Sequence, residues 1–406
     1  MKSNYITPPD NCTGCGLCDN VCPKDAIHMV WSKGGFLVPS VDVTACVDCG
    51  MCVKQCIALE EKEPYTDDLN SVESYGGWNK DVDIHLSSSS GGVFTALAVK
   101  VIEQGGVVFG VVWKDKLTAV FEKTDSEDGL ARMRGSKYTP AVPGNVYRDV
   151  RNELKNGRQV LFSGTPCQVH ALKKYLRKDY ENLLTVDIVC HGVPSHLILE
   201  RYIEEEEEKT GKEIDYVSFR DKPEGWLRYH VTRHYTDGGL QSEALGTDMY
   251  MRMFLSDKAL NHVCYNCPYA HIPRQGDITL GDYWGVEKLH PEWPIDKGVS
   301  SILANTSKGS VALNRLSDRL ELRIEPFSKI YNGQKVVYVR PEKVIPPSRS
   351  MVLERLRELS VTDVYRKVVQ TVTFGPFSLS KFSYIYRLLF TVYRAVKSVK
   401  HKLLKK

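Results

Sequence analysis

The sequence predicts two units, a small α+β module built around cysteines and a larger mixed α/β domain. The small module is predicted because eight of the twelve cysteines lie within the first 60 residues, in two runs of equal spacing. The larger domain is predicted because apolar, strand-like runs alternate with helix-like segments from about residue 90 to residue 210. With 42% hydrophobic and 26% charged residues, the 406-residue chain is typical of a folded protein of two or three domains.

The cysteines of residues 1–60 form two runs of the pattern C-x2-C-x2-C-x3-C. Every cysteine of the second run lies 34 residues after its counterpart, which indicates an internal duplication. Glycines between the cysteines allow the backbone to approach a bound group closely. A zinc module made of CxxC pairs is the competing interpretation. The cysteines are Cys12, Cys15, Cys18 and Cys22 in the first run, and Cys46, Cys49, Cys52 and Cys56 in the second.

This spacing resembles the two-cluster ferredoxins of bacteria, in which each run binds a [4Fe–4S] cluster and the fourth cysteine crosses to the other cluster. The resemblance implies that Cys56 joins the first three cysteines of the first run. It also implies that Cys22 joins the first three cysteines of the second run.

Residues 61–84 are polar and rich in turn formers, which predicts a linker to a domain at 85–345. Apolar periodicity predicts the elements of that domain, and their alternation predicts a largely parallel core. The expected helices are 93–104, 146–155, 168–177 and 197–208, and the expected strands are 107–113, 160–162 and 183–189.

Four cysteines remain outside the two runs. Cys167 and Cys190 each follow a predicted strand, where open α/β sheets place their sites. Cys264 and Cys267 form a CxxC pair. Together the four can supply thiolates to a third cluster; separately, they can be core residues and half of a zinc site.

Seven motifs in this order resemble the family of coenzyme F420 hydrogenase/dehydrogenase beta subunits, over about residues 12–330. They are SSSSGGVFTALA (87–98), RMRGSKYTPA (132–141), SGTPCQ (163–168), VCHGVPS (189–195), FRDKPEGW (219–226), CYNCPYA (264–270) and DITLGDYWG (277–285). The resemblance implies FAD with a [4Fe–4S] cluster beside it. The expected fold class is therefore an α+β ferredoxin-like dicluster module followed by a mixed α/β flavin-binding domain.

Two of these motifs supply candidate FAD contacts. Ser89, Ser90, Gly91 and Gly92 precede a predicted helix, whose free amides suit a pyrophosphate, although a plain helix cap has the same pattern. The second motif combines two cations with an aromatic ring, and a basic surface loop is its alternative interpretation. Its candidates are Arg134, Ser136, Lys137 and Tyr138, and the SGTPCQ motif adds Gly164 and Thr165.

Two residues are candidates for a catalytic role. Lys137 can stabilise negative charge that develops on a reduced flavin. His191, directly after Cys190, can donate a proton to substrate or tune a cluster, although a structural histidine is the alternative. The chain has neither G-x-G-x-x-G nor a P-loop pattern, which disfavours a Rossmann or P-loop site.

These features predict an iron–sulfur flavoprotein oxidoreductase with two [4Fe–4S] clusters, a third cluster and FAD. Electrons from ferredoxin or another electron-transfer protein would pass to FAD and then to a small-molecule substrate. The resemblance adds surface-polysaccharide metabolism as a setting. A non-enzymatic carrier subunit that serves a partner enzyme is the alternative, and a zinc-bound scaffold for polysaccharide assembly is a third.

Residues 346–406 are predicted to form a basic helical tail. Residues 364–406 hold ten Lys or Arg and no Asp or Glu, so the total charge of +4 leaves −6 for the rest, which disfavours nucleic-acid binding. From Phe382 onward, apolar residues recur in steps of three and four. Such a helix can lie on an anionic membrane surface, form a coiled coil or pack on the body. Without a signal peptide or an apolar span, we expect a cytoplasmic protein, with the inner membrane face as a peripheral position.

Overall fold

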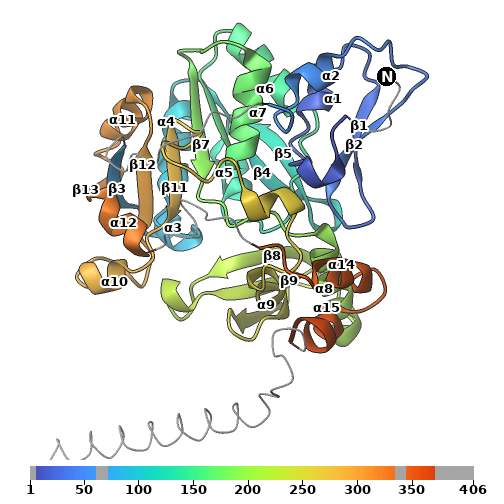
Figure 1. Cartoon of the computed structure of the whole chain (residues 1–406). Helices are drawn as coiled ribbons and strands as arrows, with labels where there is room; N and C mark the ends of the chain where they lie inside the picture. Colours follow the sequence, from blue (N-terminus) through green and yellow to red (C-terminus); the bar gives the residue numbers. More distant parts are fainter. Residues whose placement is uncertain (1–5, 61–71, 334–343, 371–406) are drawn as a thin grey trace, which may run out of the picture.

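The computed structural model describes residues 6–60, 72–333 and 344–370. The cysteine-rich module lies at one side of the molecule (Figure 1). It contains the helices α1 (Leu17–Val21) and α2 (Met51–Gln55) and an antiparallel hairpin in which Val30 faces Val38. The hairpin strands are β1 (Ile27–Trp31) and β2 (Leu37–Val41), and a 3-10 turn, η1 (Pro9–Asn11), precedes the module.

An eight-stranded mixed sheet of order β13-β3-β12-β11-β7-β6-β4-β5 forms the centre of the molecule. Its four inner strands β11, β7, β6 and β4 are parallel, which confirms the predicted parallel core, and the outer strands pair antiparallel. The strands are β3 (Glu73–Asn79), β4 (Val107–Lys114), β5 (Thr118–Thr124), β6 (Val160–Gly164), β7 (Leu183–Ile188), β11 (Ile278–Asp282), β12 (Ser300–Ala304) and β13 (Leu320–Ile324).

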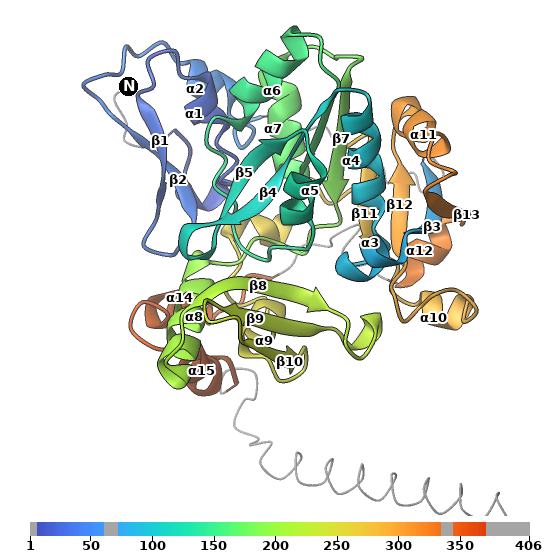
Figure 2. The same cartoon turned by 180° about the vertical axis from the view of Figure 1, so that it is seen from behind.

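Helices cover both faces of this sheet, as Figure 2 shows from behind. Alternate residues of β4 point to opposite faces: Val108 joins the apolar core under α4, α5 and α11, whereas Val107 and Phe109 join the core under α6 and α7. The helices are α4 (Val93–Glu103), α5 (Glu127–Met133), α6 (Val146–Lys155), α7 (Pro166–Leu176) and α11 (Ser307–Asn314). The predicted helices and strands from 93 to 210 are confirmed, each bound within two residues.

A second lobe forms around a three-stranded antiparallel sheet of order β10-β9-β8. Its helices enclose a separate apolar core. The strands are β8 (Ile214–Asp221), β9 (His230–Tyr235) and β10 (Leu240–Ala244), and the helices are α8 (His196–Thr210), α9 (Met249–Leu255), α14 (Arg349–Arg355) and α15 (Val361–Val364). Shorter elements are α3 (Val82–Ser87), α10 (Val286–Leu289), α12 (Phe327–Gly333), η2 (Asp115–Leu117), η3 (Trp226–Arg228), η4 (His262–Asn266) and the π-helical turn η5 (Tyr365–Val369).

The predicted linker 61–84 is too long, because β3 lies within it and α3 begins within it. The glycines that suggested a turn, Gly76 and Gly77, lie inside β3. A Cβ on Gly76 would come within 2.4 Å of Trp293, and one on Gly77 within 2.8 Å of Ile302. These glycines therefore permit close packing against β3.

The predicted tail 346–406 also begins too early. Residues 349–369 fold into α14, α15 and η5, and they bury Val352, Leu356 and Val361 in the core of the second lobe. The apolar stripe that begins at Phe382 lies outside the described residues. No helix within the described ranges is both long enough and apolar enough to span a membrane.

Candidate functional site

The two cysteine runs share one backbone conformation, as the duplication predicts. Gly16 and Gly50 precede α1 and α2 with φ of 74° and 70°, in the left-handed region that favours glycine. Cys22 and Cys56 follow these helices with φ of −68° and −65°. Each short helix therefore starts and ends in the same way.

Backbone amides point at the first thiol of each run. The amide of Gly14 donates to Cys12 Sγ, and the amide of Asp48 donates to Cys46 Sγ, each at 3.4 Å. Amide donors next to sulfur suit thiolate ligands of an iron–sulfur cluster, whose potential depends on such hydrogen bonds.

The inner cysteine set combines the first run with the last cysteine of the second. Burial raises the pKa of Cys12 to about 12, and the neighbouring Cys15 and Cys56 contribute to the increase. The pKa of Cys18 is raised by burial and by the same group of thiols. Cys56 thus lies where the ferredoxin resemblance implies.

The outer cysteine set lies closer to the surface. Burial raises the pKa of Cys52, and the neighbouring Cys22 and Cys49 also raise it. Cys49 is exposed, whereas Cys12 of the inner set is buried. Cys22 therefore lies with thiols of the second run, across from its own run.

The third set begins at the amino end of α7. Burial raises the pKa of Cys167, and the nearby thiols Cys190, Cys267 and Cys15 raise it further. Cys15 belongs to the inner set, so the third set is adjacent to the inner set. The helix amino end also favours a thiolate at this position.

Cys264 lies against the loop that follows Cys190, because the amide of Val193 donates to Cys264 Sγ at 3.4 Å. Within 6–60, 72–333 and 344–370, no group of three or more His, Cys, Asp or Glu side chains is arranged to hold a single metal ion. The cysteines of a four-iron cluster bind different irons, so they do not converge on one point. The grouping of the twelve thiols fits three such clusters, and their ligation stays a prediction.

The N-terminus of α6 fixes the module against the sheet. Asn20 Oδ1 accepts from the amide of Tyr147 at 3.1 Å, and the Tyr147 hydroxyl donates to the carbonyl of Cys15 at 2.7 Å. Arg148 Nη2 donates to the carbonyl of Cys22 at 2.9 Å. The inner and the outer cysteine sets are thus held by side chains of the larger domain. No pattern in the sequence indicated these contacts.

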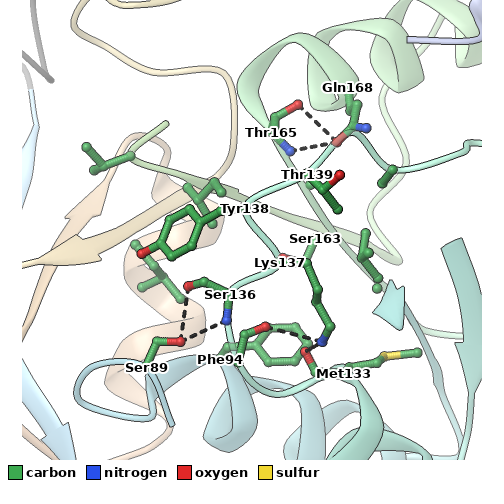
Figure 3. Close-up of a pocket in the computed structure, with 18 of the residues that line it drawn as sticks. Ser89, Phe94, Met133, Ser136, Lys137, Tyr138, Thr139, Ser163, Thr165 and Gln168 are labelled. Carbon is green, nitrogen blue, oxygen red and sulfur yellow. Dashed lines mark hydrogen bonds between the residues drawn. The ribbon is translucent and has the colours of Figure 1, made fainter. Parts of the chain in front are cut away.

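A cavity of about 330 Å³ lies at the carboxyl ends of β6, β7 and β11 (Figure 3). Open α/β sheets bind ligands at this edge, and the volume is at the lower end of the range for ligand pockets. Nearly all the predicted FAD contacts line it. The residues around it include Thr13, Gly14, Ser89, Ser90, Gly92, Arg134, Ser136, Lys137, Tyr138, Gly164, Thr165, Cys167 and Gln168.

The serine-glycine loop, residues 88–92, forms one wall of the cavity. Ser89 Oγ accepts from the amide of Ser136 at 2.8 Å and from its hydroxyl at 3.0 Å, which ties two candidate FAD segments together (Figure 3). Gly91 lies behind this wall, because its amide donates to Ser300 Oγ at 2.9 Å and a Cβ there would meet the carbonyl oxygen of Gly77 at 2.3 Å.

Lys137 lines the cavity, but its ammonium turns to the end of α5. Its three N–H groups share four backbone carbonyls at 3.0 to 3.2 Å, including those of Met133, seen in Figure 3, and Arg134. Burial lowers the pKa of Lys137 to about 7, and the Arg132 charge adds to the decrease. In this structure Lys137 caps a helix, and its role toward a flavin stays a prediction.

Gly164 and Thr165 line the cavity next to Cys167, which also lines it. The amide and the hydroxyl of Thr165 both donate to Gln168 Oε1 at 2.9 Å, which fixes the first turn of α7 (Figure 3). The Thr165 hydroxyl also lies 3.2 Å from Cys167 Sγ. The cavity therefore borders a thiol of the third set.

Arg220, from β8, is a site residue that the sequence did not indicate. It forms two hydrogen bonds to the Asp282 carboxylate, at 2.8 and 3.1 Å, and a third to the Tyr138 hydroxyl at 3.1 Å. Burial alone would lower the pKa of Arg220, but Asp282 raises it above its ordinary value. Since Tyr138 and Asp282 both line the cavity, Arg220 holds two of its walls together.

His191 is not among the residues that line the cavity. Its Nε2 lies 2.5 Å from Asp257 Oδ1, and its ring packs 5.0 Å from that of Phe254. His191 is nevertheless adjacent to Cys190 in the chain. Its pair with Asp257 and its packing on Phe254 fit the structural alternative, and both of its predicted roles stay predictions.

Comparison with known proteins identifies the family of this chain. Residues 74–146 match the N-terminal model, and residues 157–330 the C-terminal model, of the coenzyme F420 hydrogenase/dehydrogenase beta subunit, so the two cover more than half of the chain. The chain belongs to this family of beta subunits. Residues 11–58 of this beta-subunit homologue also match a 4Fe-4S dicluster domain.

One relative of this family member is a subunit of the F(420)H(2) dehydrogenase of Methanosarcina mazei. It is 22% identical over 346 residues, which are 80% of this chain and 88% of the relative. A chain of the F420-reducing [NiFe] hydrogenase complex from Methanosarcina barkeri is 17% identical, with a TM-score of 0.46 over 78% of this chain and 97% of that chain. The family predicted from the motifs is confirmed, and the chain is an iron–sulfur protein of an oxidoreductase family.

Proposed function

We propose that this chain is an electron-transfer subunit. In this proposal, the outer cluster exchanges single electrons with a partner protein, and the inner and third clusters relay them to a redox group in the cavity. One observation carries the proposal: Thr13 and Gly14, from the inner cysteine loop, and Cys167, from the third set, line the same cavity. A molecule bound there lies against two cysteine sets.

The order of the three sets supports a relay. The outer set contains the exposed Cys49, the inner set contains the buried Cys12, and Cys15 of the inner set is near Cys167. The relative from Methanosarcina mazei is named as a subunit of a dehydrogenase, which supports a role beside partner proteins.

FAD is the redox group that the family resemblance predicts for the cavity. The polar wall of Ser89, Ser90 and Ser136, together with Arg134 and Tyr138, provides donors for its phosphates and ring. When bound, a flavin supplies two-electron storage and hydride transfer, whereas each cluster moves one electron. The chain's own side chains fix the two walls of the cavity and keep Cys167 beside it.

An FAD-dependent reductase that acts on a small molecule in the same cavity is the second candidate. The position of the cavity at the carboxyl ends of parallel strands favours it. Its expected link to surface polysaccharides stays a prediction.

Cluster content and crossing test the relay. Anaerobically purified protein should contain about twelve iron atoms per chain, and Cys267→Ser should contain about eight. In low-temperature magnetic resonance spectra of the reduced protein, Cys22→Ser should change the same cluster signal as Cys49→Ser. Cys56→Ser should change the same cluster signal as Cys15→Ser. If Cys22→Ser instead changed the same signal as Cys15→Ser, the crossing of Cys22 to the cluster of the second run would be wrong. About eight iron atoms in the parent would exclude the third cluster.

Anaerobic titration separates the two candidates. A carrier subunit should accept electrons from reduced methyl viologen and pass them to cytochrome c, with no added small substrate. If reduced protein delivers its electrons only after a small molecule enters the cavity, the reductase is the correct function.

A further inference from the structure

A second cavity, of about 470 Å³, lies beside the outer cysteine set. It is bordered by α1, α2, α6 and α7, which lie side by side in both views (Figure 1, Figure 2). Cys22 and Met51 are among its lining residues. Cys22 is the thiol that crosses to the outer set, and Met51 directly precedes Cys52. The groove therefore reaches the most exposed of the three cysteine sets.

The lining of this groove is positively charged. Arg148, Arg151 and Arg177 line it, against one carboxylate, Asp25. Asp25 is already paired with Arg148 at 2.6 Å, so the other two guanidiniums set the charge of the groove.

The three arginines lie around Tyr175, which lines the same groove. Burial raises the pKa of Tyr175, and the charges of Arg151, Arg148 and Arg177 oppose that increase. Arg151 also stacks on the Tyr175 ring, with its guanidinium carbon 4.7 Å from the ring centroid. Arg151 and Arg177, whose charges Asp25 does not neutralise, therefore make this wall of the groove attractive to anions.

The outer run also exposes apolar side chains. Val47 is 57% exposed and Val53 is 48% exposed. An apolar centre with a charged rim is the usual composition of a protein–protein contact, and charge complementarity mainly raises the association rate.

We infer that this arginine-lined groove, together with the exposed face of the outer run, is the docking surface for a small acidic electron-transfer protein. The inference rests on the proposed function. In the step that it supports, the partner loses one electron and the outer cluster gains one electron; no bond and no proton changes place. A small free anion is the competing occupant, but it would carry no electron to the adjacent thiols.

Arg151 and Arg177 are the residues to change. Arg148 is unsuitable, because it also donates to the carbonyls of Cys22 and Asn20 and so supports the cysteine loops. We would compare Arg151→Gln/Arg177→Gln with Arg151→Glu/Arg177→Glu, so that the charge changes in two steps. Arg323→Glu is the matched control, because Arg323 is an exposed arginine on β13, at the opposite edge of the sheet.

The measurement is the stopped-flow rate at which each anaerobic holoprotein is reduced by a reduced plant-type [2Fe–2S] ferredoxin, used as the acidic probe. Reduced methyl viologen, a small cation, serves as the second reductant. At low salt the double Glu variant should react with ferredoxin about tenfold more slowly than the parent, with the double Gln variant between them. The parent rate should fall with added salt, and that of the double Glu variant should fall less.

Each other outcome overturns the inference in a distinct way. Equal ferredoxin rates for all variants would exclude the groove as the docking surface. An equal slowing with both reductants, at unchanged iron content and circular dichroism, would show that the two arginines act on electron entry into the clusters and not on docking. If phosphate slowed the parent where chloride of the same ionic strength did not, and all variants reacted equally with ferredoxin without phosphate, a small-anion site would replace the inference. If methyl viologen failed to reduce the parent, the proposed function itself would fail.

Discussion

At the scale of single residues, two half-buried lysines organise the candidate FAD cavity. Lys222 Nζ donates to the carbonyls of His85 at 3.0 Å, Ser90 at 2.9 Å and Lys297 at 2.5 Å. Lys222 does not line the cavity, and it holds the serine-glycine loop through the carbonyl of Ser90. Lys137 holds the end of α5 in the same way. A buried ammonium that binds only carbonyls is stabilised by dipoles and disfavoured by desolvation, so its protonation affects the fold.

The protonation of Lys222 predicts a pH-dependent stability. Burial lowers the pKa of Lys222 from its ordinary 10.5 to about 7, and the Arg220 charge adds to the decrease, against Asp282. Between these values the unfolded chain binds more protons than the native one, so the free energy of unfolding rises with pH. The contribution is fully present above pH 10.5 and is lost as the pH falls through 7.

Relative to Lys222→Met, the parent should therefore gain up to about 2 kcal/mol of unfolding free energy between pH 7 and pH 9. Anaerobic urea unfolding at both pH values measures this difference. Lys222→Arg, which stays charged over the whole range, is the control and should show no such gain. Parallel pH profiles for the parent and Lys222→Met would show that Lys222 keeps its ordinary pKa.

Site residues with a spacing pattern were predictable, and those without one were not. The cysteine runs were found because their spacing in the chain is itself the ligand geometry. Arg220 and Lys222 lie in a motif that was recognised as a whole, yet their partners are up to 137 residues away. Contacts of this length depend on strand order, which the sequence does not state.

At the scale of elements, the duplication gives two matched helices with different surroundings. A Cβ on Gly16 would lie 2.3 Å from Cγ of Pro143, whereas one on Gly50 would have no atom within 4 Å. Both glycines have positive φ, so replacing either one carries the same conformational cost. The pair therefore separates backbone strain from docking of the module on the larger domain.

Gly50→Ala should destabilise the protein by about 1 kcal/mol, from the left-handed backbone alone. Gly16→Ala should cost clearly more, because Pro143 lies next to the loop that enters α6 and must move. Thermal unfolding under anaerobic conditions, followed by iron release, measures both variants. Equal shifts would mean that the module adjusts at Pro143 without loss.

The same scale explains which elements the sequence predicted. The strands β4, β6 and β7 and the helices between them have strong apolar periodicity and short connections, so their order was predictable. Strand β3 was missed because Gly76 and Gly77 interrupt its apolar pattern, although neighbouring side chains require that interruption. The second lobe was not separated from the rest because its helices come from segments about 150 residues apart, α8 and α14.

At the scale of the whole molecule, the C-terminal segment completes the second lobe, which in turn supports the cavity. Val352, Leu356, Val361 and Val364 are fully buried in the same core as β8. Since β8 carries Arg220 and leads directly into Lys222, the residues after 344 stabilise the cavity without lining it.

This connection predicts the result of two truncations. A chain that ends at Gln370 keeps every described element, and it should unfold at the same temperature as the full chain. A chain that ends at Ile345 loses four fully buried apolar side chains, each worth roughly 1.5–3 kcal/mol, which together approach the whole stability of a domain. Limited proteolysis should then cut within β8 to β10, and the flavin binding proposed for the cavity should be lost while the dicluster module keeps its iron. If the shorter chain resisted protease as well as the longer one, the second lobe would be stable by itself, and the cavity would not depend on α14 and α15.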